Sequence, residues 1–136
     1  MDDVNATLRI SAAGMRAQGT RLRVIAENIA NADSAATQPG ELPYRRQTVT
    51  FRNALDRAAG AQTVHVKEIA DDPSPFQRRW DPSHPAADAG GYVLESNVNP
   101  LIEMTDMREA QRSYEANLNV IRATKGMLQD AIDVLR

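Results

Sequence analysis

Apolar residues near the start of the chain follow a helical spacing. From Val4 to about Ile29 they fall on one stripe, which includes Ile25 and four residues at intervals of seven: Leu8, Met15, Leu22 and Ile29. No Pro interrupts this segment, and Asn28, Asn31 and Asp33 are residue types that commonly end a helix. The pattern predicts an N-terminal helix within residues 1–31, of about 26 residues and roughly 39 Å.

The last part of the chain carries a second apolar stripe. Asn99 and Pro100 form a start signal, because Asn caps a helix and Pro suits its first position. Downstream, five residues recur every seven positions with two others interleaved: Met107, Tyr114, Ile121, Leu128 and Leu135, with Leu118 and Ile132. The pattern predicts a C-terminal helix within residues 99–136, of about 35 residues and roughly 52 Å.

Polar residues interrupt both stripes. In a coiled coil, each helix has two alternating sets of apolar positions that face the partner helix, here called seam positions. Ser11 and Gln18 occupy the second set in the first helix, and Gln111 and Lys125 interrupt the second set in the second helix. Such positions weaken a two-stranded coiled coil but allow neighbouring helices to approach closely.

The middle of the chain, residues 32–98, predicts a loop and a small β region. Partial or strict alternation indicates strands at residues 44–51, 64–69 and 92–94, separated by segments rich in Pro, Gly and Asp. The predicted fold is therefore mainly α with a small β region. Long N- and C-terminal helices form a coiled-coil-like pair around short middle strands, in one subunit spanning residues 1–136.

Composition limits the core that this pair can build alone. Only six of the 136 residues are Phe, Trp or Tyr. About a dozen seam side chains contribute roughly 1.5–3 kcal/mol each on full burial, whereas ordering some sixty helical residues costs roughly 1–2 kcal/mol each. We expect the helices to gain neighbours from other subunits and to stay largely disordered until then.

Charge and residue types exclude several function classes. The net charge of −2 gives no reason to expect nucleic acid or an anionic membrane as the main partner. The absence of Cys excludes disulfides and thiol chemistry. No stretch reaches the roughly 18–20 apolar residues that span a bilayer, and the start lacks the pattern of a cleaved signal peptide.

Candidate catalytic and metal-binding residues have simpler explanations as parts of strands and turns. His65 lies in an alternating strand and His84 in a Pro-containing turn, without the spacing of helical zinc sites. The pairs Arg45-Arg46 and Arg78-Arg79 lie beside aromatic residues, as in some RNA-binding proteins, but isolated Arg pairs in an acidic chain are more often solvated or interfacial. We predict no catalytic residue, metal site or cofactor.

Two longer runs carry a family resemblance. Residues 13–33, which include Ala26-Glu27-Asn28-Ile29-Ala30-Asn31, resemble the N-terminal signature of flagellar axial proteins, the rod and hook family. Residues 97–117, which include Asn97-Val98-Asn99-Pro100 and Ser113-Tyr114-Glu115-Ala116-Asn117, resemble the matching C-terminal signature. The short length leaves no room for the extra middle domains of distal rod and hook members.

The resemblance implies a structural subunit of the proximal rod, required for motility, that assembles through its terminal helices into the helical drive shaft transmitting motor torque. It implies residence in the periplasmic part of the basal body after export without a cleaved signal peptide. The implied partners are copies of the chain, other proximal and distal rod subunits, the rod-base adapter and the type III export apparatus, with the surrounding P ring as a further candidate.

The predicted assembly interface consists of the apolar residues of the two stripes and of Asn28, Asn31 and Met104 from the two signature runs. Its residues are Leu8, Met15, Leu22, Ile25, Asn28, Ile29, Asn31, Met104, Met107, Tyr114, Leu118, Ile121, Leu128, Ile132 and Leu135.

Two other classes of function remain as alternatives. A soluble helical adaptor or chaperone-like module would be a folded, protease-resistant monomer, whereas a rod subunit would have mobile ends in its free form. A small enzyme would depend on His65 or His84, so replacing both with Ala would abolish its function.

Overall fold

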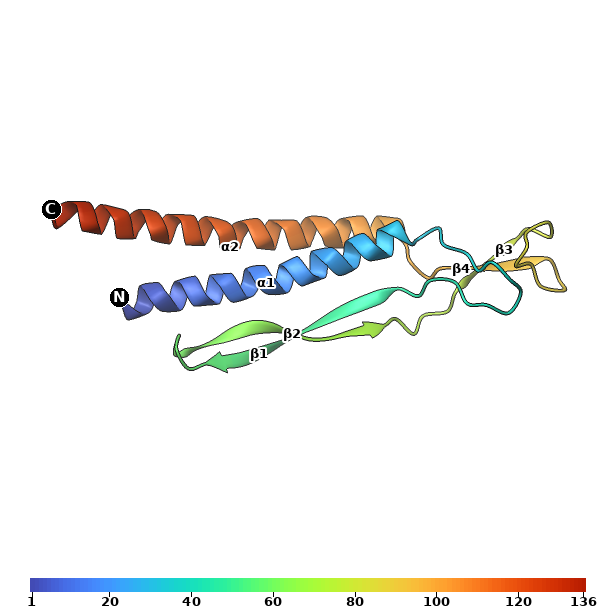
Figure 1. The fold of residues 1–136 in the computed structure, drawn as a ribbon, viewed down its shortest axis with the longest axis horizontal. Coiled ribbons are helices and arrows are strands. Elements are labelled where there is room, and N and C mark those ends of the chain that lie inside the picture. Colours follow the sequence, from blue (N-terminus) through green and yellow to red (C-terminus); the bar gives the residue numbers. More distant parts are fainter. The chain divides into compact units, whose positions relative to one another are not determined.

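The computed structural model describes residues 1–136 and contains two long helices with four strands between them (Figure 1). The order is α1 (Asp2–Ala30), β1 (Gln47–Asp56), β2 (Ala61–Asp71), β3 (Gln77–Trp80), β4 (Tyr92–Glu95) and α2 (Pro100–Val134). The chain divides into two compact units. The first contains Met1–Leu22, Val49–Glu68 and Arg108–Arg136, and the second contains Arg23–Thr48 and Ile69–Met107.

Both predicted helices are confirmed, with ends where the signals indicated. α1 has 29 residues and α2 has 35. At the start of α2, the Asn99 side-chain Oδ1 accepts a hydrogen bond from the Leu101 N–H at 3.1 Å, and the Asn99 carbonyl accepts one from Glu103 N–H at 3.1 Å. At the end of α1, the side chain and the backbone N–H of Asn31 both donate to the Glu27 carbonyl, at 2.8 and 3.1 Å.

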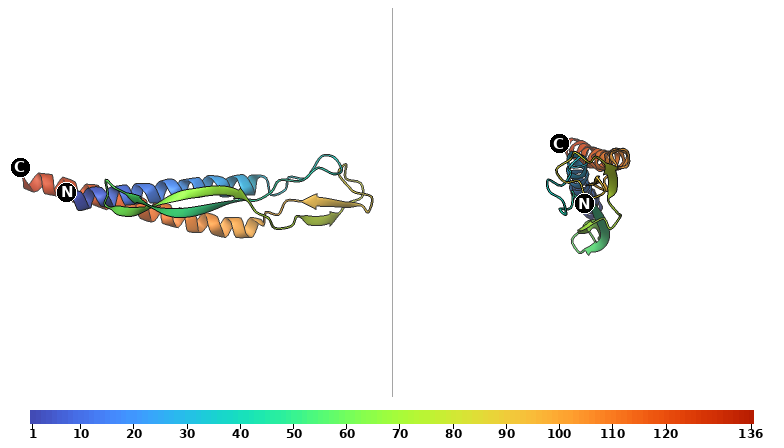
Figure 2. Two further views of the ribbon diagram at one scale, coloured as in Figure 1. Left: turned by 90° about the horizontal axis from the view of Figure 1, so that it is seen from below. Right: turned by 90° about the vertical axis from the view of Figure 1, so that its right-hand side faces the viewer.

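In the first unit, α1 lies between α2 and the β1–β2 hairpin (Figures 1 and 2). The two helices run antiparallel, because early residues of α1 contact late residues of α2. Leu128 lines one recess with Val4 and Leu8, Gly14 lies against Asn117, and Arg21 pairs with Glu109 at 3.7 Å. On its other side, α1 reaches the hairpin through Arg9, whose Nε donates to Asp56 at 3.0 Å.

The second set of seam positions on α2 differs from the prediction. Ala110 and Thr124 are buried and Asn117 is partly buried, and they alternate with the predicted residues Tyr114, Ile121 and Leu128. The prediction placed Leu118 and Ile132 in this second set, with Gln111 and Lys125 interrupting it. Gln111 and Lys125 are exposed, and the true positions lie one residue earlier in each heptad.

Close helix approach explains this difference. A Cβ atom added to Gly14 would lie only 2.7 Å from Asn117 Nδ2, and Ser11 and Ala13 on the same helix are also small and buried. Where two backbones come this near, small and polar side chains fit the contact better than large apolar ones.

The strands are longer and more numerous than predicted. The segments expected at 64–69 and 92–94 occur within β2, which has 11 residues, and β4. The segment expected at 44–51 occurs as β1, which has 10 residues but begins at Gln47, three residues later than predicted. Strand β3 was missed because its four residues are all exposed and lack apolar alternation. It pairs antiparallel with β4 from Gln77↔Glu95 to Trp80↔Tyr92.

A small apolar cluster supports this second sheet. Val93 on β4 is fully buried and lies with the buried Ala36 and Ala86. Across the whole chain, the buried apolar residues are only Ala, Val and Ile. Neither helix is long and apolar enough to cross a membrane.

Candidate functional site: a polar junction and uncovered helix faces

A network of polar side chains joins four segments of the second unit, and its centre is Arg46. The Arg46 guanidinium pairs with Asp72 at 3.0 Å, with Asp106 at 3.5 Å and, through Nε, with Glu103. Glu103 is fully buried on α2, so its charge depends on this partner. We call this group the polar junction.

Asn28 joins α1 to the polar junction. Its side-chain amide donates to the Gln47 carbonyl at 2.8 Å and to Glu103 at 3.3 Å. Its side-chain oxygen accepts from the Tyr44 hydroxyl at 2.8 Å and from the Gln47 N–H at 3.0 Å. Asn28 is buried, and these bonds satisfy both ends of its side-chain amide group.

The residues flanking Arg46 and Asp72 hold the two connecting segments together. Arg45 donates to the carbonyls of Asp72 at 2.8 Å and Ser74 at 3.1 Å, and its guanidinium lies 4.2 Å from the centre of the Phe76 ring. Asn97 donates to the same two carbonyls, and its side-chain oxygen accepts from the Arg46 N–H at 2.7 Å. Arg45 and Arg46 are therefore structural residues of this unit, with no guanidinium left over for a nucleic acid.

Burial, hydrogen bonds and nearby charges shift the pKa values of three residues in and beside the polar junction. Burial disfavours the charged form of Arg46, but hydrogen bonds with Glu103 and Asp72 outweigh it and raise its pKa. Burial, together with the nearby carboxylates of Glu27, Glu103 and Asp71, raises the pKa of Tyr44. The hydroxyl and N–H of Ser74, with Arg46, lower the pKa of Asp72 from 3.8 to about 2.

Asp72 should make the second unit acid-sensitive in a defined pH range. Its pKa is lower in the folded chain, so its stabilising contribution is complete above pH 3.8 and is lost as the pH falls towards 2. We expect this contribution to be about 1–2 kcal/mol. Urea unfolding at pH 5 and pH 2.5 measures it, and an Asp72→Asn variant should lose less stability between these pH values than the parent chain. Equal losses would show that another group carries the acid sensitivity.

The two histidines bond within their own strand or turn. His65 Nε2 lies 2.7 Å from the Thr63 hydroxyl, two residues away on β2. His84 Nδ1 accepts from the Ala86 N–H at 3.0 Å within a turn. They belong to different units of the chain.

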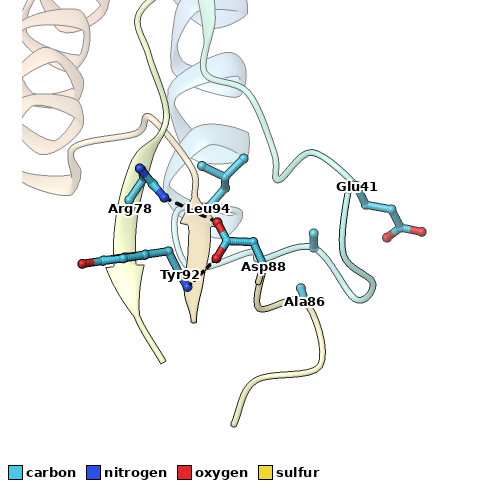
Figure 3. Close-up of a pocket in the computed structure, with 8 residues that line it drawn as sticks. Glu41, Arg78, Ala86, Asp88, Tyr92 and Leu94 are labelled. Atoms are coloured by element: carbon cyan, nitrogen blue, oxygen red, sulfur yellow. Dashed lines mark hydrogen bonds and ion pairs between the residues drawn. The ribbon is translucent and has the colours of Figure 1, made fainter. Parts of the chain in front are cut away.

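A recess of about 330 Å³ lies beside β3 and β4 (Figure 3). Its charged residues are Glu41, Arg78 and Asp88. The Asp88 carboxylate accepts from the N–H groups of Tyr92 and Gly90, both at 2.9 Å, and pairs with Arg78 at 3.4 Å. These bonds lower the pKa of Asp88. Arg78 and Asp88 form an ion pair, and Asp88 also accepts hydrogen bonds from the turn backbone. We therefore interpret these charged residues as stabilising the turn and not as a reaction site.

The predicted interface residues fall into three groups by exposure. Ile25 and Asn28 are buried. Ten are partly buried: Leu8, Met15, Leu22, Ile29, Asn31, Met107, Tyr114, Leu118, Ile121 and Leu128. Met104, Ile132 and Leu135 are exposed. Most of the two stripes is therefore at least partly buried within the chain, and the end of the second stripe is exposed.

Sequence reasoning included Asn28 but missed its partner Glu103 and the cation Arg46 that pairs with Glu103. Glu103 lies seven residues before Ala110 on α2, in line with Ala110 and Asn117, but this line of buried positions appears only in the structure. A buried acidic side chain needs a cation, and no local pattern in the sequence identified Glu103 as buried.

Comparison with known proteins agrees with both terminal signatures. Residues 89–134 match a family model described as the C-terminal region of the flagellar basal-body rod FlgEFG proteins. A flagellar basal-body rod protein FlgC from Agrobacterium fabrum is 50% identical over 136 residues, which is 100% of this chain and 98% of that protein. The chain belongs to the FlgC family of flagellar basal-body rod proteins.

Two more distant FlgC proteins extend the comparison. The protein from Buchnera aphidicola of Acyrthosiphon pisum is 40% identical and covers 92% of this chain and 93% of its own length. The Bacillus subtilis protein is 38% identical, and the match covers 94% of this chain and 95% of that protein. Members of the FlgC family are structural rod proteins, and the chain is accordingly a structural protein and not an enzyme. Membership also implies assembly with other components of the flagellar rod.

Proposed function

We propose that this chain is a subunit of the flagellar proximal rod and that its terminal helices assemble, as a coiled-coil-like pair, into the helical drive shaft that transmits motor torque. In this proposal the chain acts in the periplasm after export by the type III apparatus without a cleaved signal peptide. Its neighbours are copies of itself, other proximal and distal rod subunits and the rod-base adapter, with the P ring around them.

The uncovered end of the α2 stripe carries this proposal. Leu128 already lies beside Met1 and Val4, at the first turn of α1. Leu135 keeps the seven-residue spacing of Leu128, and Ile132 lies between them, one turn after Leu128. Figure 1 shows that the C-terminal end of α2 extends beyond the N-terminus. Ile132 and Leu135 are 55% and 87% exposed. Apolar residues of α2 pack against α1 up to Leu128, and the apolar residues that follow are exposed. Such an exposed apolar surface supports contact with a helix of another subunit.

The small core supports the same proposal. The buried apolar residues include no Leu, Met or aromatic residue. Burial of one large apolar side chain contributes about 1.5–3 kcal/mol. An assembly that covers the exposed Ile132 and Leu135 therefore gains burial energy that the single chain does not have.

A charge placed on the uncovered stripe tests the proposal. We expect Ile132→Asp to block rod assembly and swimming, because assembly would bury an unpaired carboxylate. Its matched control is Gln129→Asp, which adds the same charge at an exposed position between Leu128 and Asp130. Basal bodies isolated from cells expressing each variant are examined by electron microscopy, and swimming is scored in soft agar. Normal rods and swimming in Ile132→Asp cells would contradict the proposal.

A further inference from the structure

An open recess in the first unit runs along α1 beside Tyr114 of α2. The recess has a volume of about 390 Å³ and is lined by Ala12, Met15, Arg16, Gly19 and Tyr114. Ala12 and Gly19 are seven residues apart, and the nearest atom to a Cβ added at Gly19 is 3.9 Å away, on Tyr114. Small residues at these two positions leave room for bulky side chains from another helix. We call this recess the α1 groove.

The second half of α2 carries an apolar stripe that does not face α1. Val120, Met127 and Val134 recur every seven residues and are 41%, 68% and 86% exposed. Val120 and Met127 each precede a seam residue, Ile121 and Leu128, so this stripe is turned about 100° around the helix from the seam. Ala123 lies between Val120 and Met127 and is also exposed. We call this the tail stripe.

We propose that the tail stripe of one copy docks into the α1 groove of a second copy. Two large side chains of the stripe are separated by seven residues, about 10.5 Å along a helix, and the two small residues of the groove have the same separation. Equal spacing lets consecutive large side chains enter consecutive gaps, as knobs enter holes between packed helices. This inference rests on the proposed function and specifies one contact of the assembly.

Charge at the rims favours a second copy as the occupant. Arg16 borders the groove and is exposed, and no carboxylate of its own chain pairs with it. Asp130 lies one turn after Met127 at the edge of the tail stripe and is likewise exposed and unpaired. Docking of the stripe brings a free carboxylate to a free guanidinium, which helps fix the direction and register of the contact.

The contact also has the symmetry that a tube requires. The groove and the stripe are different surfaces of one chain, so each copy offers a groove to one neighbour and a stripe to another. A contact of this kind passes from copy to copy, whereas a self-complementary patch would close a dimer.

Engineered cysteines test the contact directly, because the chain has no Cys of its own. Cells produce the chain with Ala12→Cys and Met127→Cys together, and their basal bodies are oxidised and run on non-reducing gels. We expect covalent dimers and larger species, at least tenfold more than in a control carrying Met127→Cys with Gln62→Cys on the exposed side of β2. Each single-Cys chain shows the background.

Charge reversal gives a second, independent measurement, which decides the matter if the double-Cys chain fails to assemble. We expect Arg16→Glu and Asp130→Arg to reduce swimming severalfold when alone and to restore it when combined. Cells that swim and contain rods, yet show no excess of the 12–127 cross-link and no mutual rescue, would overturn this inference and leave the proposed function intact. The absence of rods in all Ile132→Asp cells, by contrast, bears on the proposed function alone.

Discussion

Replacing Arg46 with Met should destabilise the second unit by about 3–5 kcal/mol, because it leaves the fully buried carboxylate of Glu103 without a cation. Asp72 and Asp106 lose the same partner. The free energy of unfolding of the full-length chain, measured in guanidinium chloride, gives the size of this effect.

Two further variants separate the buried charge from other causes. Arg78→Met removes an exposed pair with Asp88 and should cost less than about 1 kcal/mol. Adding Glu103→Met to Arg46→Met removes the buried charge and should recover much of the lost stability. A loss of the same size in Arg46→Met and Arg78→Met would show that burial of Glu103 is not the cause.

Replacing Gly14 with Leu should separate the two helices of the first unit and cost about 1–3 kcal/mol. Even a Cβ at this position would lie 2.7 Å from Asn117 Nδ2, and that amide already donates to the Ser113 carbonyl at 3.0 Å. A larger side chain forces Asn117 out of its place and breaks this hydrogen bond. Thermal unfolding followed by circular dichroism at 222 nm measures the loss.

Gly126 provides the matched control on α2. No atom lies within 4 Å of a Cβ built there, so Gly126→Leu should stabilise the helix by about 0.5–1 kcal/mol through propensity alone. Adding Asn117→Ala to Gly14→Leu should relieve part of the overlap. Similar melting temperatures for the Gly14 and Gly126 variants would mean that the helices do not approach closely at this point.

The helices could be predicted from the sequence because their signals are local. The seven-residue spacing of Leu8, Met15, Leu22 and Ile29 and the Asn99-Pro100 start depend only on neighbouring residues. The second seam position of α2 could not be predicted in this way. It depends on how near the helices come at Gly14, and this distance is a property of the pair and not of either stripe.

The candidate site was predictable in part for the same reason. Asn28 belongs to a recognisable local run at the end of α1, but its role depends on Gln47, 19 residues away, and Glu103, 75 residues away. Arg46 looked like half of a solvated Arg pair because no local pattern shows that three carboxylates surround it. Strand β3 escaped prediction because backbone pairing with β4 holds it, while its side chains remain in solvent.

Trp80 is the sole tryptophan of the chain and lies on β3, inside the second unit. Intrinsic fluorescence excited at the indole band is therefore an optical reporter of that unit alone, whereas far-ultraviolet dichroism is dominated by the long helices. A single denaturant titration read by both signals would show whether the region around the polar junction melts separately from the helical ends.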